Sequence, residues 1–539
     1  MKSNNSGKVL DCTLRDGGYY NNWDFELPAV EAYLNAMAFA GVDIVELGFR
    51  FRDNTGFKGP FAFTTDHFLG QLSIPESLEI GVMINAADLL TADSVVRAVQ
   101  ELFPLPANLT RVSLVRIATH FHEYKQIRPA IKWLNDRGYK VGLNLMQISE
   151  QPLDNLATFS SNIADWPLEV LYFADSLGSL TPECVRNIVG RLRAGWPGDI
   201  GIHTHDNMGL ALSNTLTAIG CGAAWVDATV QGMGRGPGNA RVEELLIELN
   251  SLDGRPLNLA PLLRLISEWF RPLLTRYKWG TNVFYFLAGK YGIHPTYIQE
   301  MLGDKRYSEE DILSVIDHLR DQGGRSFSYS RLSSARQFYV GKPRGTWTPS
   351  SVFRGKDILL LGTGPGVSTH RPAIVEFIKK TKPIVVALNA QSILDSSLID
   401  MRIACHPVRL LADASAHSRL PQPLIAPASM LPKGLRSELG PKKLLDFGLG
   451  VKDFKFEFND KYCIAPNALV LSYALATMES GQAGRIYMAG FDGYDAGDER
   501  NDEVEAMFDL FSKSVSGNRL VSITPTKYKN LSSISVYAL

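Results

Sequence analysis

Eight short apolar runs, recurring about every 30 residues over roughly the first 230 positions, constrain the fold of this 539-residue chain more than any other feature. The runs are 8–14, 43–49, 78–85, 111–118, 140–146, 168–174, 200–205 and 224–230. Most are continuously apolar, which is typical of parallel strands buried on both faces by helices. Segments with helical periodicity lie between them, such as 26–41, which ends at glycine, a common helix terminator. Eight such units predict an α/β fold in the form of a (β/α)8 TIM barrel rather than an open sheet.

The rest of the chain divides by pattern into three further parts. The barrel is expected to span residues 1–254, and the helical patterns of 255–323 predict a helical extension to it. Residues 324–355 are rich in Ser, Arg, Gly and Pro and predict a linker. Alternating strand and helix patterns restart after it, which predicts a smaller, Rossmann-like α/β domain over 356–539. Its predicted strands are 357–362, 383–389, 401–406, 423–428 and 485–492.

Charge and cysteine content exclude several classes of protein. The chain has 55 basic and 56 acidic residues, so no basic surplus indicates binding to nucleic acid or to an anionic membrane. Its five scattered cysteines form no Cys-x-x-Cys pair, which disfavours a disulfide scaffold or a thiolate zinc site. The polar start and the lack of a long apolar run predict no signal peptide and no membrane insertion. We expect a soluble, cytoplasmic protein that acts on small molecules, and a homo-oligomer remains open.

Polar side chains gather at the C-terminal ends of the predicted barrel strands, where barrel enzymes keep their chemistry. A glycine-rich loop, residues 232–239, follows the last strand. Its glycines either let backbone N–H groups form an anion-binding nest or make a tight turn into the next helix. The strand-end side chains are Arg15, Asp16, Glu46, Asn85, Thr119, His120, Gln147, Asp175, Ser176, His203 and His205.

Three of these side chains suggest a metal centre. His203 and His205 are two positions apart on one strand, so both imidazoles face the same side. Asp16 adds a carboxylate at the same mouth, and this set suits a divalent metal with coordination positions left open for substrate. The alternative is a pair of hydrogen-bonded histidines. Arg15 either stabilises substrate charge or forms an ion pair at the mouth, and Glu46 is expected to orient it.

Longer motifs around these residues carry a family resemblance. The segments LDCTLRDGGYY (10–20), IHTHDNMGLALSNT (202–215) and GMGRGPGNARVEEL (232–245) together resemble the metal-dependent pyruvate aldolases of the 4-hydroxy-2-oxovalerate aldolase group. That group belongs with 3-hydroxy-3-methylglutaryl-CoA lyase and the isopropylmalate synthases, and the resemblance covers about residues 8–322. It implies Mn2+ or Mg2+ on Asp16, His203 and His205, with Asn239 ligating or bordering the metal.

The resemblance also implies a reaction: retro-aldol cleavage to pyruvate and an aldehyde, or the reverse condensation. Arg15 and the metal would stabilise the pyruvate enolate, and Ser176 would lie near the substrate carboxylate. The aldolases carry a catalytic histidine three residues after the aspartate, where this chain has Tyr19. Tyr19 therefore stands in the place of the proton-transfer group, and Tyr285 is the candidate for a second tyrosine from the helical extension.

An insertion-like stretch, residues 48–67, is a second departure from those aldolases. We expect its polar side chains to bind a polar or anionic acceptor such as a sugar or a phosphate. The alternative is a solvated loop that packs its own phenylalanines. The side chains concerned are Arg50, Arg52, Lys58, Thr64 and Thr65, of which Arg50 and Lys58 are the leading candidates.

The last domain begins with a strand, the glycine loop GTGPG and a helix, an arrangement that lets a nucleotide phosphate approach the backbone. The order of ALN (387–389), IAPNALVLSYALA (464–476) and IYMAGFDGYDA (486–496) resembles small bacterial sialyltransferases and related sugar-nucleotide-binding proteins, over about residues 355–539. The resemblance implies a nucleotide or nucleotide-sugar site. Its candidate residues are Gly362, Gly364, Asn389, Asn467 and Asp492.

The leading interpretation is a divalent-metal-dependent aldolase that joins or cleaves pyruvate and an aldehyde. By analogy with the last domain, we expect the aldehyde to be sugar-derived and the pathway to be surface-polysaccharide biosynthesis. One alternative is an acyl-CoA-dependent Claisen enzyme on the same barrel. The other is a nucleotide-sugar-binding protein or glycosyltransferase with the barrel as scaffold.

Overall fold

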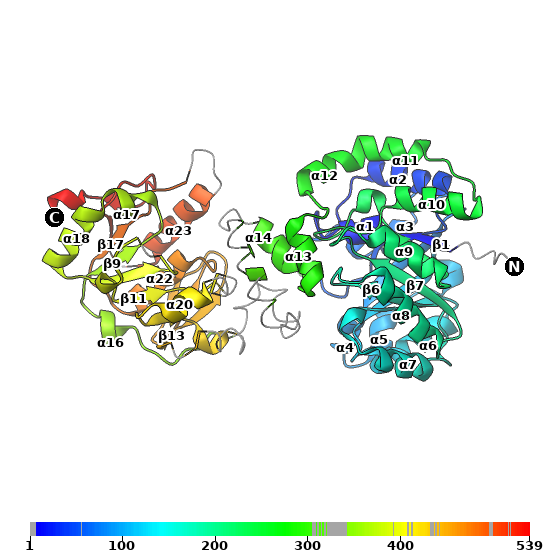
Figure 1. The fold of residues 1–539 in the computed structure, drawn as a ribbon, viewed down its shortest axis with the longest axis horizontal. Coiled ribbons are helices and arrows are strands. Elements are labelled where there is room, and N and C mark those ends of the chain that lie inside the picture. Colours follow the sequence, from blue (N-terminus) through cyan, green and yellow to red (C-terminus); the bar gives the residue numbers. More distant parts are fainter. Residues whose placement is uncertain are drawn as a thin grey trace. The chain divides into compact units, whose positions relative to one another are not determined.

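The chain divides into two compact units, Met1–Ser308 and Glu309–Leu539 (Figure 1). Within the described part of the chain, no helix is both long and apolar enough to cross a membrane. The computed structural model describes residues 7–303 except 55, isolated positions between 309 and 320, and 342–539 except 392, 407–408, 411–412, 432–435, 437–438, 441, 495–499, 516 and 518.

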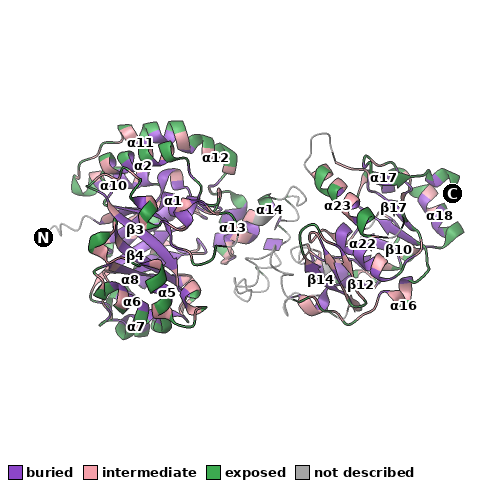
Figure 2. Cartoon of the chain, turned by 180° about the vertical axis from the view of Figure 1, so that it is seen from behind, coloured by how far each residue is buried: buried purple, intermediate pink, exposed green. Residues whose placement is uncertain are grey.

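The first unit is a closed barrel of eight parallel strands in chain order, so the predicted (β/α)8 barrel is confirmed. Each strand lies within, or within one residue of, one of the eight predicted runs. Figure 2 shows the strands as the buried interior and the outer faces of the helices as exposed. The strands are β1 (Lys8–Asp11), β2 (Ile44–Phe49), β3 (Glu79–Asn85), β4 (Val112–Thr119), β5 (Lys140–Leu145), β6 (Val170–Asp175), β7 (Asp199–Thr204) and β8 (Trp225–Ala228).

Most helices of this unit cover the outside of the barrel, and the first of them lies at its mouth. The second of them ends at Gly41, whose φ of 81° is in the left-handed region that favours glycine. The helices are α1 (Thr13–Gly17), α2 (Leu27–Ala40), α3 (Asp66–Leu69), α4 (Ala86–Leu90), α5 (Val95–Leu102), α6 (Arg128–Asp136), α7 (Leu153–Asn162), α8 (Pro182–Arg193), α9 (Ala211–Gly220) and α10 (Val242–Asp253).

Helices also follow the barrel, in the region predicted as its extension. They are α11 (Ala260–Leu265), a π-helical turn (Ile266–Phe270), α12 (Arg271–Tyr277), α13 (Val283–Tyr291) and α14 (Pro295–Gly303). The Trp279 indole donates to the Gln231 carbonyl and the Thr281 hydroxyl to the Asn207 carbonyl. These bonds fasten the chain before α13 to the loops at the barrel mouth.

The second unit contains an eight-stranded parallel sheet and a smaller three-stranded one of order β14-β16-β15, so the predicted second α/β domain has a parallel sheet. The large sheet has the order β13-β12-β11-β10-β9-β17-β18-β19. The chain therefore reverses its direction of travel across the sheet between β9 and β17. The carboxyl ends of strands flanking such a reversal form the crevice where open α/β sheets bind ligands.

The strands of the large sheet are β9 (Ile358–Leu361), β10 (Ile384–Leu388), β11 (Met401–Ile403), β12 (Leu424–Ala426), β13 (Leu444–Asp446), β17 (Ile486–Ala489), β18 (Leu520–Ser522) and β19 (Ser532–Ser533). The small sheet contains β14 (Gly448–Val451), β15 (Glu457–Phe458) and β16 (Tyr462–Ala465). The helices are α16 (Ser350–Phe353), α17 (Pro365–Thr369), α18 (Arg371–Thr381), α20 (Ala414–Arg419), α22 (Val470–Ser480) and α23 (Arg500–Ser514).

The region predicted as a linker differs from that expectation at its C-terminal end. Residues 324–341 lie outside the described part of the chain. Thr346 and Trp347 donate their backbone N–H groups to the Asp446 carbonyl, and α16 begins three residues later. Because these groups bond to the end of β13, the second unit includes at least part of the segment 342–355.

Candidate active site

The short helix α1 places Arg15 and Asp16 at the mouth of the barrel, directly after β1. Both side chains are buried and form an ion pair with each other. The second oxygen of Asp16, Oδ2, accepts a hydrogen bond from Nδ2 of Asn239 at 2.7 Å. Asn239 comes from the glycine-rich loop after β8, so the structure brings together residues from opposite ends of the barrel sequence.

His203, near the end of β7, completes this group. Its Nε2 lies 3.4 Å from Oδ2 of Asp16, and its Nδ1 lies 2.9 Å from Oδ2 of Asp227. A carboxylate accepts the Nδ1 proton, so the neutral ring carries its lone pair on Nε2, toward Asp16. His205 has the same tautomer, because its Nδ1 donates to the Asp175 carbonyl at 2.8 Å. Burial lowers the pKa of His205 to about 4, which keeps this imidazole neutral.

These residues fit a divalent cation. Nε2 of His203 and Oδ2 of Asp16 both present lone pairs at 3.4 Å, and ligand atoms on neighbouring vertices around a cation bound at about 2.1 Å lie about 3 Å apart. Oδ1 of Asn239 is buried without a hydrogen-bond partner among the described residues. Burial opposes ionisation of Asp16, but the positive charge of Arg15 and the hydrogen bond from Asn239 favour the carboxylate, and the pKa of Asp16 is lowered.

Not every predicted ligand lies equally close to this position. In the described part of the chain, the acidic, thiol and imidazole groups whose ligand atoms all lie within 4.8 Å of one another are Cys12, Asp16 and His203. The ring of His205 stands against that of His203, with the centroids 5.2 Å apart. Burial raises the pKa of the Cys12 thiol well above its ordinary value, so Cys12 stays protonated and is a weak ligand.

The sequence predicted only part of a buried network behind the site, because it paired Glu46 with Arg15 but did not include Arg116 and Asp227. Glu46 accepts two hydrogen bonds of 2.7 Å from Arg116 and one of 2.8 Å from Arg15. Arg116 donates a further hydrogen bond of 2.7 Å to Asp227, the residue that holds His203. The signal for both missed residues was available, because a charged residue inside an apolar strand must find a partner.

The tyrosines predicted for proton transfer lie around the mouth. Tyr19 is 41% exposed, and the guanidinium of Arg235 lies over its ring at 4.8 Å. Tyr285 is buried beside the glycine-rich loop: a methyl group on Gly236 would lie 3.1 Å from its phenol oxygen. Burial raises the pKa of Tyr285 above its usual value and that of Tyr20 to about 12, so neither is ionised near neutral pH.

Ser176 lies in the loop after β6, and its hydroxyl accepts a hydrogen bond of 3.0 Å from the backbone N–H of Gln147. Asp175, the preceding residue, is buried and accepts from the N–H groups of Ser179 and Leu180. Burial raises the pKa of Asp175 to about 7. The structure thus places both residues at the mouth, where Ser176 holds the loop and retains its own proton to donate.

The insertion-like loop does not present Arg50 to a substrate. Its guanidinium is buried and donates to the carbonyl oxygens of Thr64 and Leu102 and to the Asp66 carboxylate. These partners engage all three guanidinium nitrogens of a buried side chain, so the expectation of substrate binding is corrected to a structural role. Lys58 pairs with Asp53 of the same loop at 3.3 Å, and its role in binding an acceptor stays a prediction.

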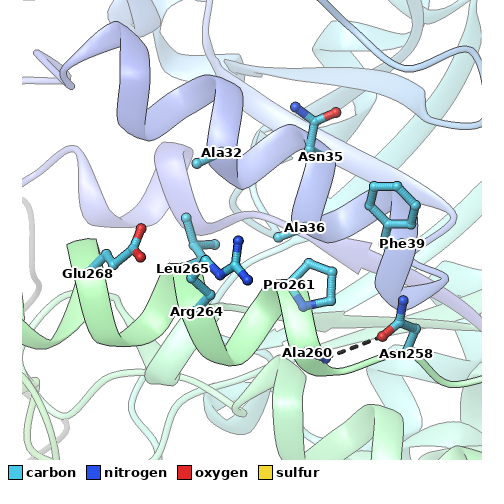
Figure 3. A pocket seen from close by; sticks show the side chains of 10 residues that line it. All are labelled: Ala32, Asn35, Ala36, Phe39, Asn258, Ala260, Pro261, Arg264, Leu265 and Glu268. Atoms are coloured by element: carbon cyan, nitrogen blue, oxygen red, sulfur yellow. Dashed lines mark hydrogen bonds between the residues drawn. The ribbon is translucent and has the colours of Figure 1, made fainter.

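A groove of about 390 Å³ between α2 and α11 is separate from this centre (Figure 3). Phe39 lies on one side of it, and Arg264 and Glu268 lie on the other. The size suits a small ligand. Its lining residues include none of the predicted metal or substrate residues, so we do not place the chemistry there.

In the second unit, the structure brings Gly362, Gly364 and Asp492 together at the reversal between β9 and β17. A methyl group on Gly364 would lie 2.1 Å from a carboxylate oxygen of Asp492, and one on Gly362 would lie 2.5 Å from the Gly490 carbonyl. Asn389 follows β10 with φ 53°. Asn467 accepts hydrogen bonds from Ser472 and from the Leu469 N–H group at the start of α22. An acidic group over the glycine turn disfavours a phosphate there, because the charges repel.

The closed parallel barrel, with a carboxylate and two imidazoles at the carboxyl ends of its strands, defines a barrel enzyme with a centre suited to a divalent cation. The HMGL-like family model matches residues 105–264. An oxaloacetate decarboxylase from Mycobacterium tuberculosis is 28% identical over 243 residues, which are 45% of this chain and 69% of that protein. A 4-hydroxy-2-oxovalerate aldolase from Thermomicrobium roseum is 30% identical over 262 residues, covering 48% of this chain and 70% of the relative.

A solved N-terminal domain from Bacteroides vulgatus aligns with 57% of this chain and 99% of its own length, at 32% identity and a TM-score of 0.49. The chain belongs to the HMGL-like family. It is an enzyme of the carbon–carbon lyase class, the class to which the named aldolase and decarboxylase relatives belong. None of the relatives named here is a sialyltransferase, so that resemblance of the second unit stays a prediction.

Proposed function

We propose that the barrel is a divalent-metal-dependent pyruvate aldolase, which forms or cleaves the bond between pyruvate and an aldehyde. The observation that carries the proposal is the pair of facing lone pairs on Asp16 and His203 beside the guanidinium of Arg15. The relatives named above are an aldolase and an oxaloacetate decarboxylase. Both reactions pass through the enolate of pyruvate, so one site that stabilises an enolate serves either of them.

Asp16, His203 and His205 would hold the cation, with Asn239 at its border. When bound, a divalent cation supplies Lewis-acid polarisation of the keto group of a 2-keto acid. Arg15 contributes from the protein side, because its Nη2 is buried and has no partner among the described residues. This N–H group would donate to the oxygen on which the enolate charge develops. Ser176 would donate its hydroxyl proton to the substrate carboxylate.

Proton transfer is assigned to Tyr19, the more exposed of the tyrosines at the mouth. Glu46 is an unsuitable base because its two oxygens accept three hydrogen bonds from Arg15 and Arg116. The high pKa values of Tyr20 and Tyr285 exclude both as bases at neutral pH. Tyr19 would act as an acid toward the aldehyde oxygen, or relay a proton through water.

The test is exchange of the methyl protons of pyruvate in deuterated water with Mn2+, followed by NMR. Exchange by the wild type and its loss in Asp16→Asn support the proposal. A wild type that binds Mn2+ but exchanges no methyl protons and cleaves no 2-keto acid would refute it. Oxaloacetate added in parallel separates decarboxylation from aldol cleavage. Acetyl-CoA condensation without pyruvate exchange would favour the Claisen alternative.

We also propose a nucleotide or nucleotide-sugar site in the second unit, because Gly362, Gly364 and Asp492 gather at the reversal of the sheet, where a ribose or sugar rather than a phosphate would lie. The carboxylate of Asp492 would accept the hydroxyl protons of a ribose or a sugar. A sugar-derived aldehyde and a place in surface-polysaccharide synthesis form part of this proposal and rest on the resemblance alone. Calorimetric titration with CMP and UDP tests it, and Asp492→Asn should weaken any binding. No heat with either nucleotide would contradict the proposal.

A further inference from the structure

Arg116, in the middle of β4, bridges two carboxylates that serve opposite ends of the candidate site. Its Nε and Nη2 bind both oxygens of Glu46 at 2.7 Å, and its Nη1 binds Asp227 at 2.7 Å. Glu46 in turn holds Nε of Arg15, and Asp227 holds Nδ1 of His203. The substrate-binding guanidinium and the metal-binding imidazole are thus joined through one side chain.

The barrel interior makes room for this side chain. A methyl group on Gly142 of β5 would lie 3.0 Å from Cγ of Arg116, tighter than an ordinary contact. The guanidinium carbon stands over the ring of Tyr172 at 4.5 Å, and a methyl group on Gly201 would lie 2.6 Å from that ring. Glycine inside a strand weakens it unless something must approach closely. Here the two glycines admit a large cation and the aromatic ring that supports it.

Stability alone does not account for this arrangement. Arg116, Glu46 and Asp227 are all almost fully shielded from solvent, and buried ion pairs are often no more stabilising than apolar side chains of similar volume. Hydrogen bonds with a planar, forked guanidinium do fix geometry at both ends. The arrangement therefore favours a role in orienting other groups.

We propose that Arg116 is a positioning residue that sets the rotamer of Arg15 through Glu46 and the tautomer of His203 through Asp227. The inference rests on the proposed function, because it gives Arg15 to the substrate and His203 to the cation. It follows that affinity for the 2-keto acid and affinity for the metal are coupled inside the barrel. The network has a substrate arm, from Arg116 through Glu46 to Arg15, and a metal arm, from Arg116 through Asp227 to His203. A substitution of Glu46 or Asp227 disrupts one arm alone, whereas a substitution of Arg116 disrupts both.

The test measures two quantities in each variant: the Kd for Mn2+ without substrate, by EPR, and the KM for pyruvate in methyl-proton exchange at saturating Mn2+. Asp227→Asn should weaken Mn2+ binding by about 10–100-fold, as loss of a partner to a ligating histidine typically does, with a smaller change in KM. Glu46→Gln should raise KM about tenfold and leave the Kd for Mn2+ within about threefold. Arg116→Lys should worsen both quantities.

Arg116→Lys leaves a buried site imperfectly paired and can fail to fold, so a second variant keeps every charged side chain of the network. Gly142→Ala pushes a methyl group against Arg116 and should weaken both affinities in the same direction. Gly81→Ala on β3 is the matched control, because its methyl group would meet Leu114 at an ordinary 3.4 Å. Its two affinities should equal those of the wild type.

Two outcomes would overturn the proposal: equal effects of Glu46→Gln and Asp227→Asn on both quantities, or identical affinities in Gly142→Ala and Gly81→Ala. A failure of the proposed function is distinguishable from these. If the wild type binds Mn2+ but exchanges no pyruvate protons and cleaves no 2-keto acid, the aldolase assignment fails. The metal arm is then still judged by the Kd for Mn2+ and by the ring-nitrogen NMR shifts of His203, which report its tautomer.

Discussion

Substituting Gly238 by alanine tests how tightly the loop that carries Asn239 is built. Gly238 has φ 78°, and a methyl group on it would lie 2.4 Å from the backbone oxygen of Gly232. Gly254, at the end of α10, has a similar φ of 74° but nothing within 4 Å of the added methyl group. The two substitutions share the left-handed strain and differ in the space available, so Gly254→Ala is the control.

The strain of a left-handed alanine, about 1–2 kcal/mol, is partly offset by the lower entropy of its unfolded chain, about 0.4–1 kcal/mol. Gly254→Ala should therefore lose about 1 kcal/mol of stability. Gly238→Ala must also move the backbone, which disturbs the bonds from Asn239 N to the Gly232 carbonyl and from Asp206 N to the Gly238 carbonyl. At about 1 kcal/mol for each bond, the total loss is about 3 kcal/mol.

Differential scanning calorimetry measures this difference, because the barrel transition is the one that Mn2+ should shift. At roughly 2–4 °C per kcal/mol for a unit of this size, Gly238→Ala should lower the barrel Tm by about 6–12 °C and the control by about 2–4 °C. Gly238→Ala should also weaken Mn2+ binding through the displaced Asn239. Equal Tm shifts in the two variants would refute the reasoning about the loop.

Three further substitutions follow from the same structure. Burial raises the pKa of Glu243 from 4.5 to about 7, so the folded state holds its proton more tightly than the unfolded state and loses relative stability as pH rises between these values. The free energy of unfolding of Glu243→Gln, relative to that of the wild type, should thus rise by up to about 3 kcal/mol between pH 4.5 and pH 8. Curves of Tm against pH that run parallel for the two proteins would exclude this. Arg50→Gln should lower the free energy of unfolding of the barrel by about 3 kcal/mol and leave the KM for pyruvate within twofold of the wild-type value. A raised KM at unchanged Tm would instead indicate that Arg50 binds the substrate. Tyr19→Phe should slow aldol cleavage of a 4-hydroxy-2-keto acid at least tenfold at unchanged Mn2+ affinity, and an unchanged cleavage rate would remove Tyr19 from proton transfer.

Local patterns were sufficient to predict the barrel. The recurrence of apolar runs predicted the positions of all eight barrel strands, because strands buried on both faces consist of continuous runs of Val, Ile and Leu. Asp16 and His203 could also be predicted, since each sits where a strand ends and the geometry of a barrel brings those ends together. The smaller sheet of the second unit was missed, as were β13, β18 and β19 of the large sheet; β15 and β19 have two residues each, too few to show a period.

Contacts between distant residues could not be predicted in the same way. Arg50 looked available on a polar loop, yet carbonyl oxygens of Thr64 and Leu102 engage it, and no sequence pattern marks a carbonyl as an acceptor. Arg116 and Asp227 are 111 positions apart and occupy apolar runs that suggested only a strand. A charged residue inside an apolar run is expected to have a partner. The identity of that partner depends on which strands become neighbours when the barrel closes.

The charges of the network would explain why the proposed metal and substrate sites share one interior. Two guanidinium groups, Arg15 and Arg116, face three carboxylates, Asp16, Glu46 and Asp227, which leaves one unbalanced negative charge in a buried cluster. Such a charge is costly away from water. A bound divalent cation would reverse the sign of the cluster, and the carboxylate of a bound 2-keto acid would then bring it to neutrality. Cation and substrate therefore each lower the electrostatic cost that the other would meet alone, and the stability of the barrel should rise with the occupancy of both.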